Sequence, residues 1–363
     1  MKNNNKSPFV WDSYSDQPHI IKDKEYKKSM RKKHIKDFFY MALTNLLIFP
    51  TSILTMKLFK PSNDKSGTKK EFYGLGVNLD KGEAQQELIE ELGVKSLIIR
   101  VPLSDIKNIK RYREFALSFG EDKNILINIM QDREHIDDKE LLSLHIATLF
   151  ENFKDITSEY QVGTTINRAK WGFFSVSEYL HFYKVVQDIR DDKYSNFKLI
   201  GPSVIDFEYH YTIRALFNNF DISFDKLSSL LYVDRRGSAY NTQMGIFDLQ
   251  NKIDMLYSLV RMSPKMKSDD IYITETNWPL SGTAPYAPTS EKECVDEDIY
   301  SKYMLEYFDI AKKTSKISKV YWHQLIAPGY GLVDNRDGKI RKTKAFYQFK
   351  SMINSTNSCT INN

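Results

Sequence analysis

One glutamate has a sequence setting that suggests chemistry. Glu275 lies in YITETNWP, where it follows alternating apolar residues and precedes Asn-Trp-Pro. Because apolar residues at every second position are typical of a β-strand, this carboxylate should emerge at the end of a strand covering 270–278. It could attack the anomeric carbon of a sugar, or stabilise positive charge that develops there. A purely structural ion pair with Arg100 or Arg168 is the alternative.

Polar or aromatic side chains stand near the end of every strand that we expect. In chain order they are Asn78, Arg100, Asn128 with Gln131, Asn167 with Arg168, Asp206 with Glu208, Tyr232 with Asp234, Glu275 with Asn277, and Trp322 with His323. One or two such ends are commonly structural, whereas a polar group at every end indicates a site built where the strand ends meet. The same ends carry three indoles that could stack on sugar rings, Trp171, Trp278 and Trp322. Nearby cations weakly favour an acidic or phosphorylated saccharide: Arg168, Lys170, Arg235 and Arg236.

The elements that must position these residues alternate regularly after Glu71. Apolar runs predict strands at 72–79, 96–103, 124–131, 160–168, 197–206, 228–235, 270–278 and 318–325. Apolar residues three and four positions apart predict helices at 83–92, 139–153, 178–190, 247–260, 299–311 and 343–353. This alternation predicts an α/β fold, a (β/α)8 TIM barrel over 71–353. A doubly wound open sheet would carry a GxGxxG loop after its first strand, and GLGVNLDKG does not match it.

The predicted barrel resembles the clan of retaining (β/α)8-barrel glycoside hydrolases, nearest to its xylosidase- and cellulase-like families. The resemblance implies that Glu275 is the nucleophile, that Arg100 stands beside it and that Trp322 floors the sugar subsite. It also implies an asparagine followed by the acid/base glutamate on the fourth strand. Here Asn167 is followed by Arg168.

This departure matters because a retaining mechanism needs a second carboxyl group about 5–5.5 Å from the first. An arginine stays protonated and cannot exchange that proton. Three explanations remain open. The acid comes from Asp206 or Glu208, or else from Asp234; the substrate has an acidic leaving group that Arg168 stabilises; or the site binds a glycan without cleaving it.

Two classes of function therefore remain. The first is a retaining glycoside hydrolase or transglycosidase that acts on a cell-envelope saccharide and needs no cofactor or metal, with Asn167 on the sugar 2-hydroxyl and Arg100 keeping Glu275 ionised. The second is a catalytically silent glycan-binding or polysaccharide-assembly protein that uses the same end of the barrel. Further substrate-binding residues are expected to be Asn78, Tyr232, Asp234, Asn277, Trp278 and His323. A long loop over 277–298 should form one wall of the cleft.

Other classes fit the sequence poorly. A phosphate-using barrel enzyme would need a glycine-rich loop and a helix start after the last strands, and Gly329 and Gly331 have no helix start beside them. A nucleic-acid groove would need cations spread over the folded part, whereas 52 basic and 47 acidic residues nearly balance. The two cysteines, Cys294 and Cys359, make neither a disulfide framework nor a zinc motif.

An uncharged apolar stretch precedes the predicted barrel. Residues 38–56 read FFYMALTNLLIFPTSILTM, and a helix of this length could just cross a hydrocarbon core of about 30 Å. Eight basic residues crowd between Lys22 and Lys36, which favours a cytoplasmic position for this flank. We therefore expect a cytoplasmic tail at 1–37, a membrane-spanning helix at 38–56, a linker at 57–70 and a C-terminal tail at 354–363, with the barrel outside the cytoplasm. A helix lying on a membrane surface or on the barrel is the alternative.

Overall fold

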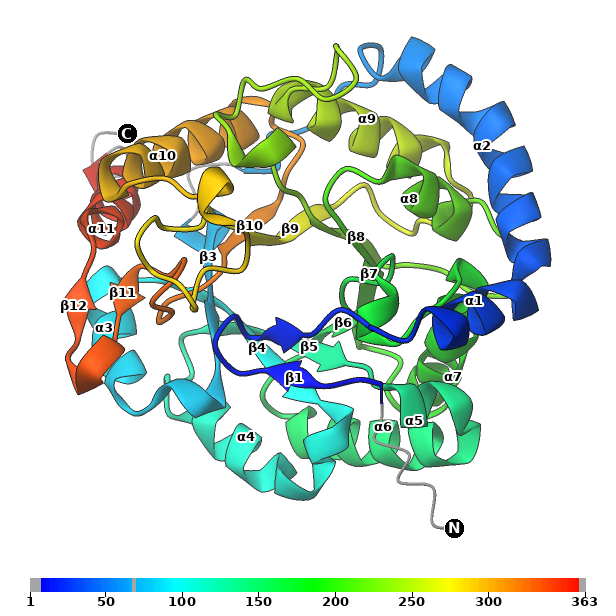
Figure 1. The fold of residues 1–363 in the computed structure, drawn as a ribbon, viewed down its shortest axis with the longest axis horizontal. Coiled ribbons are helices and arrows are strands. Elements are labelled where there is room, and N and C mark those ends of the chain that lie inside the picture. Colours follow the sequence, from blue (N-terminus) through cyan, green and yellow to red (C-terminus); the bar gives the residue numbers. More distant parts are fainter. Residues whose placement is uncertain (1–7, 67–69, 359–363) are drawn as a thin grey trace.

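Eight parallel strands close into a barrel in the computed structural model, which describes residues 8–66 and 70–358. They are β3 (Tyr73–Val77), β4 (Ser96–Pro102), β5 (Asn124–Met130), β6 (Glu159–Val162), β7 (Lys198–Ile205), β8 (Lys226–Leu230), β9 (Ile271–Thr276) and β10 (Lys319–Trp322). Each strand pairs with the next in sequence, and β10 closes the ring on β3 through Val320 opposite Tyr73. The predicted (β/α)8 barrel is confirmed (Figure 1).

Helices follow the strands and form the outer ring (Figure 1). They are α3 (Ala84–Leu92), α4 (Ile109–Leu117), α5 (Arg133–Asp137), α6 (Lys139–Phe153), α7 (Val176–Lys193), α8 (Tyr209–Leu216), α9 (Leu249–Met262), α10 (Glu297–Lys313) and α11 (Lys344–Ser358). Several begin at a side chain that accepts a hydrogen bond from the backbone N–H three residues on, as Asp138 does for α6 and Asp248 for α9. Such caps satisfy N–H groups that a helix start would otherwise leave unpaired.

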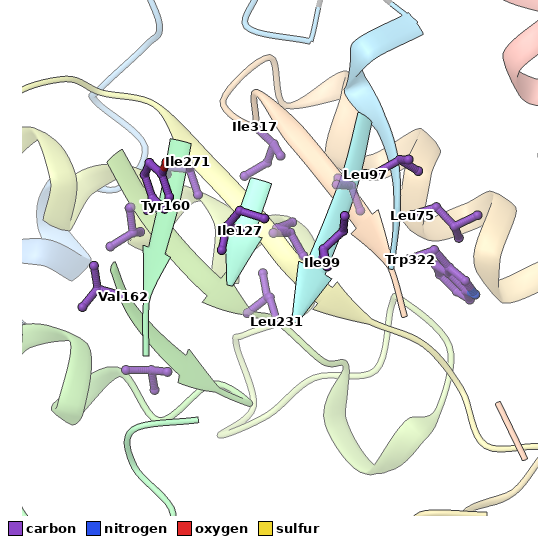
Figure 2. Packing of buried hydrophobic residues seen from close by; sticks show 14 of the residues in the cluster. Leu75, Leu97, Ile99, Ile127, Tyr160, Val162, Leu231, Ile271, Ile317 and Trp322 are labelled. Carbon is purple, nitrogen blue, oxygen red and sulfur yellow. The ribbon is translucent and has the colours of Figure 1, made fainter. Parts of the chain in front are cut away.

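The main core lies between the strands and the helices. Along β4, Leu97, Ile99 and Val101 point outward into this core, so Ile98 and Arg100 point into the barrel. Figure 2 shows side chains of the outer core, and those labelled are Leu75, Leu97, Ile99, Ile127, Tyr160, Val162, Leu231, Ile271, Ile317 and Trp322.

A smaller cluster fills the inside of the barrel. It contains Ile98, Leu126, Ile200, Tyr272 and Tyr321. Below it, at the N-terminal ends of the strands, Glu159 forms ion pairs with Lys226 and Lys319. The filled lower half leaves only the opposite end, where the strands finish, for a site; we call this end the mouth.

The predicted elements differ from the observed ones in length and in three omissions. The fourth and sixth strands end earlier than expected, so Asn167, Arg168, Tyr232 and Asp234 lie in the loops that follow them. Helices α4, α5 and α8 were not predicted, although α4 buries Ile109, Tyr112, Phe115 and Ala116 at the usual helical spacing.

The N-terminal segment folds onto the barrel. It contains the strand pair β1 (Trp11–Asp12) and β2 (Gln17–Pro18), followed by α1 (Lys24–Lys33) and α2 (Ile35–Thr55). In Figure 1 the segment of β1 and β2 crosses in front of the barrel, and α2 runs along the outer ring beside α8 and α9. Among the described residues, α2 alone is long and apolar enough to cross a membrane. The expected apolar helix is thus present.

Helix α2 is attached to the barrel along its length. At its start, Asp37 forms an ion pair with Arg214 at 2.7 Å. In its middle, Asn45 donates a hydrogen bond to the carbonyl of His210. Near its end, the hydroxyl of Thr55 lies 2.8 Å from that of Ser258. The predicted membrane-spanning helix would be separated from the barrel, and this packing differs from that arrangement. The predicted tails and linker lie partly outside the described residues, as does Cys359.

Candidate functional site

Glu275 points into the mouth because β9 contains a bulge. Strand β10 pairs Val320 with Ile273 and Trp322 with Thr276, so β9 has one extra residue between these pairs. A bulge of this kind changes the face that the following side chains take. As a result Thr274 and Glu275 both line the inner hollow, whereas simple alternation would send one of them outward.

The Glu275 carboxylate is held by two donors. Arg100 donates from Nη2 to one oxygen at 2.7 Å, and the hydroxyl of Tyr232 donates to the other at 2.6 Å. Burial acts to raise the pKa of Glu275, but His323, Arg100 and the Tyr232 hydrogen bond outweigh it and lower the pKa. Glu275 is therefore an ionised, partly exposed carboxylate at neutral pH, as expected for a group next to Arg100.

Unpaired polar atoms surround this carboxylate. Within the described residues, no hydrogen-bond partner is found for Nη1 of Arg100 or for side-chain oxygens of four further residues, Asn128, Gln161, Thr164 and Thr274. All five residues line the same hollow as Glu275, together with Asn78 and His323. Buried polar atoms without partners are costly, so this ring is suited to a ligand that carries many hydroxyl groups.

The fourth strand's expected residues lie to one side of this ring. Arg168 forms ion pairs with Asp206 at 2.7 Å and with Glu208 at 2.5 Å. The amide of Asn167 donates to Glu208 and to the carbonyl of Ile205. Asn167 is thus committed to protein partners, which disagrees with its expected place on a sugar hydroxyl.

The predicted sugar-stacking role is wrong for two of the three tryptophans. Trp278 and Trp322 are completely buried and stack on each other in the outer core, 5.9 Å apart. The reason is strand parity: Tyr321 points into the barrel, so Trp322 points outward and His323 inward again. Figure 2 shows Trp322 within the outer packing.

Some of the remaining predicted residues lie at the hollow around Glu275, and others hold the neighbouring backbone in place or lie away from the hollow. Asn78 and His323 line the central hollow. Tyr232 donates a hydrogen bond to Glu275, which also lines it. Asn277 donates to the carbonyl of His323 at 2.6 Å and so fixes the backbone beneath the site. Asp234 lines neither this hollow nor the larger cavity beside it.

Sequence reasoning missed the hairpin at 10–19, which crosses the mouth. The hollow at Glu275 has about 10 Å³ of free volume, enough for about one water molecule. A cavity of about 680 Å³ opens beside the hairpin, lined by Trp11, Asp16 and Trp171 among others. Arg100 and Asn78 line both spaces. The hairpin therefore lines the open cavity at the point where that cavity meets the residues around Glu275.

Comparisons with known proteins bear on the fold. No family model matches the chain, and no curated protein is significantly similar to it. Solved structures do match. A β-glucosidase from Thermotoga maritima in complex with glucoimidazole has a TM-score of 0.56 at 11% identity, covering 80% of this chain and 99% of its own. A glucosidase from Croceicoccus marinus has a TM-score of 0.58 at 10% identity, covering 82% of this chain and 68% of its own.

A further structural match is a monomeric β-xylosidase from Caulobacter crescentus, with a TM-score of 0.54 at 12% identity. It covers 77% of this chain and 67% of its own. At such identities the likeness establishes the fold alone. The chain has the barrel that these glycoside hydrolases share, in agreement with the resemblance seen in its sequence.

Proposed function

We propose that the barrel acts on a saccharide by a retaining mechanism, as a hydrolase or transglycosidase, with Glu275 as the nucleophile. The observation that carries this proposal is the Glu275 carboxylate itself. It is ionised, held between Arg100 and Tyr232, and surrounded by unpaired polar atoms at the bottom of the mouth. The shared fold of the matched glycosidases supports it.

In this mechanism a Glu275 oxygen forms a bond to the anomeric carbon while the bond to the leaving oxygen breaks. Tyr232 and Arg100 keep the attacking carboxylate oriented and ionised. The leaving oxygen takes a proton from a second carboxyl group, which then activates the water or acceptor hydroxyl that releases the sugar. Asp206 and Glu208 are our candidates for that group, with Asp234 after them. No cofactor takes part.

Catalytically silent glycan binding, as in polysaccharide assembly, is the second candidate. One observation favours it: a single guanidinium, that of Arg168, engages both Asp206 and Glu208. While those ion pairs persist, neither carboxyl group is free to serve a leaving oxygen. The polar ring around Glu275 would serve binding equally well.

Covalent trapping of Glu275 tests the catalytic proposal. The full chain is incubated with a panel of 2-deoxy-2-fluoro glycosides, and intact mass is measured. We expect a mass increase of one fluorosugar in the wild type and none in Glu275→Gln. Glu114→Gln, an exposed change on α4, should label like the wild type. Labelling that survives in Glu275→Gln would contradict the assignment, and saccharide binding without labelling would favour the second candidate.

We further propose that α2 attaches the barrel to a membrane, which would bring the site to saccharides of the cell envelope. The expected single-pass arrangement needs residues 1–37 and the barrel on opposite sides of the bilayer. In the described conformation, however, the hairpin before α2 contacts the mouth, and α2 itself packs on α8 and α9. The attachment that this conformation supports has α2 lying along the membrane surface.

A further inference from the structure

The hairpin at 10–19 places one carboxylate in the mouth. Its turn carries Asp16, which is buried. Oδ2 of Asp16 lies 3.3 Å from the amide nitrogens of both Asn78 and Gln324. The same oxygen is 3.6 Å from Nη1 of Arg100 and 3.9 Å from Nζ of Lys81. We call Asn78, Lys81, Arg100 and Gln324 the carboxylate cradle, because two amide donors and two cations converge on one carboxylate oxygen.

Asp16 fits this cradle loosely. Hydrogen bonds between a carboxylate and a cation are usually about 2.7–2.9 Å long, which Arg100 achieves with Glu275 but not with Asp16. Nη1 of Arg100 has no hydrogen-bond partner among the described residues. Asp16 has a φ of 55°, in the left-handed region that aspartate and asparagine adopt more readily than most other residues. A carboxylate that approached a little further would bind the cradle better.

The hairpin is also held by few contacts. Its strands pair at only two positions, and an isolated two-stranded hairpin is marginally stable in water. Outside the cradle, Trp11 packs edge-on against Trp171 and Tyr14 against Tyr286. Lys170 donates to Gln17 at 2.6 Å, Gln17 donates to the carbonyl of Pro288 at 3.4 Å, and Tyr330 donates to that of Ser15 at 3.5 Å. Trp11 and Tyr14 remain about half exposed. The hollow at Glu275 holds about one water, so a sugar ring needs more room there than the described conformation gives, and departure of the hairpin from the neighbouring cradle would supply it.

We propose that the cradle is a subsite for the carboxylate of an anionic saccharide, of the uronic acid class, and that Asp16 occupies this subsite until the saccharide displaces the hairpin. The proposal rests on the saccharide function proposed above. Arg100 links the two parts of the site, since Nη1 faces the cradle and Nη2 binds Glu275. A saccharide carboxylate on Nη1 would therefore lie directly beside Glu275.

A matched pair of sugars tests this subsite. Binding of D-glucuronate and D-glucose, which differ by the C6 carboxylate, is measured by calorimetry on the full chain and on Asp16→Asn. Asparagine keeps the shape of aspartate and tolerates the left-handed conformation. We expect Asp16→Asn to bind glucuronate about tenfold more tightly, because an occupied site reduces apparent affinity, and to change glucose binding less than twofold. Lys81→Met in the Asp16→Asn background should reverse the gain.

Hydrogen exchange on the wild-type chain gives a second measurement that does not depend on these variants. The His19 amide donates a hydrogen bond to the carbonyl of Val10 within the hairpin at 2.7 Å. Saturating glucuronate should speed exchange of this amide, and glucose should leave its exchange rate unchanged. Equal binding of glucose and glucuronate would overturn the cradle and leave the saccharide function standing. Binding of neither sugar, with fluorosugar labelling of Glu275 intact, would do the same. Loss of both binding and labelling would remove both proposals.

Discussion

His323 is a buried histidine that lies beside both charges of the central site. Its ring stacks on Tyr330 at 5.5 Å and lines the hollow around Glu275. Burial, helped by the positive charge of Arg100, lowers the pKa of His323 to about 4. At neutral pH the imidazole is therefore uncharged, so its charge acts on Glu275 only at low pH, and Arg100 and the Tyr232 hydrogen bond keep Glu275 ionised at neutral pH. His323 can offer a sugar a neutral donor or acceptor.

The lowered pKa of His323 predicts a pH dependence of stability. Since the pKa in the folded state, about 4, lies below the ordinary 6.5, the unfolded chain takes up the proton first as the pH falls. The contribution of neutral His323 to the free energy of unfolding is therefore complete above pH 6.5, and it is lost as the pH falls from 6.5 to 4. It amounts to about 3 kcal/mol, at about 1.4 kcal/mol for each pKa unit.

Urea unfolding at pH 7.0, 5.5 and 4.5 measures this contribution. The His323→Gln variant should lose less stability on acidification than the wild type, by up to about 3 kcal/mol. His181→Gln, an exposed change on α7, should follow the wild-type curve. Parallel curves for wild type and His323→Gln would show that His323 is not buried in the neutral form.

At the scale of the elements, the sequence is sufficient for the barrel but not for every side-chain direction. Eight apolar runs separated by amphipathic segments leave few other folds, and Arg100 follows simple alternation into the mouth. Glu275 does not follow from the runs alone, because a one-residue bulge in β9 changes which of its residues face inward. Trp322 follows the simple alternation of β10, outward between Tyr321 and His323, which the expected sugar subsite did not take into account. The hairpin strands have two residues each, too few for any periodicity, and Asp16 meets partners as distant in sequence as Gln324.

The outward direction of Trp322 gives a test at this scale. Its indole is completely buried and donates from Nε1 to the hydroxyl of Tyr300 at 2.7 Å. Trp322→Ala should therefore cost about 3–5 kcal/mol of unfolding free energy, through the cavity that it leaves. The same substitution at Trp11, which is about half exposed, should cost less than about 1 kcal/mol. Chemical denaturation of the two variants and the wild type measures both losses of unfolding free energy. A stable Trp322→Ala protein that had lost only sugar binding would mean that the indole faces the mouth after all.

At the scale of the whole molecule, the N-terminal segment joins the mouth to one outer face of the barrel. The hairpin crosses part of the mouth, α1 follows it, and α2 then runs along the side formed by α8 and α9 (Figure 1). The outer face of α2 exposes a row of large apolar side chains: Ile35, Phe39, Tyr40, Leu43, Leu46, Leu47 and Leu54. Basic residues crowd on α1 immediately before it, with Arg31, Lys32 and Lys33 in its last turn. An apolar face next to a cationic helix is typical of attachment to an anionic membrane surface.

Vesicle flotation tests this attachment. The full chain should float with vesicles of phosphatidylglycerol and phosphatidylcholine and much less with phosphatidylcholine alone, because each lysine near an anionic surface contributes about 1 kcal/mol. Replacing Leu46 and Leu47 with glutamate should reduce binding at least tenfold, since burying a leucine is worth about 1.5–3 kcal/mol. Leu144→Glu, which changes a similarly exposed leucine on α6, should bind as the wild type does. Unchanged flotation of the double variant would contradict a role for α2.

Tags at the two chain ends then separate a surface helix from a spanning one. If α2 lies along the membrane, as its contacts with Arg214 and Ser258 require, a protease added to sealed vesicles or cells reaches an N-terminal tag and the barrel from the same side. Protection of one of them alone would mean that α2 crosses the bilayer. In that case α2 must leave α8 and α9, and the hairpin must leave the mouth with it. The side on which the N-terminus lies would then decide whether Glu275 is covered or open.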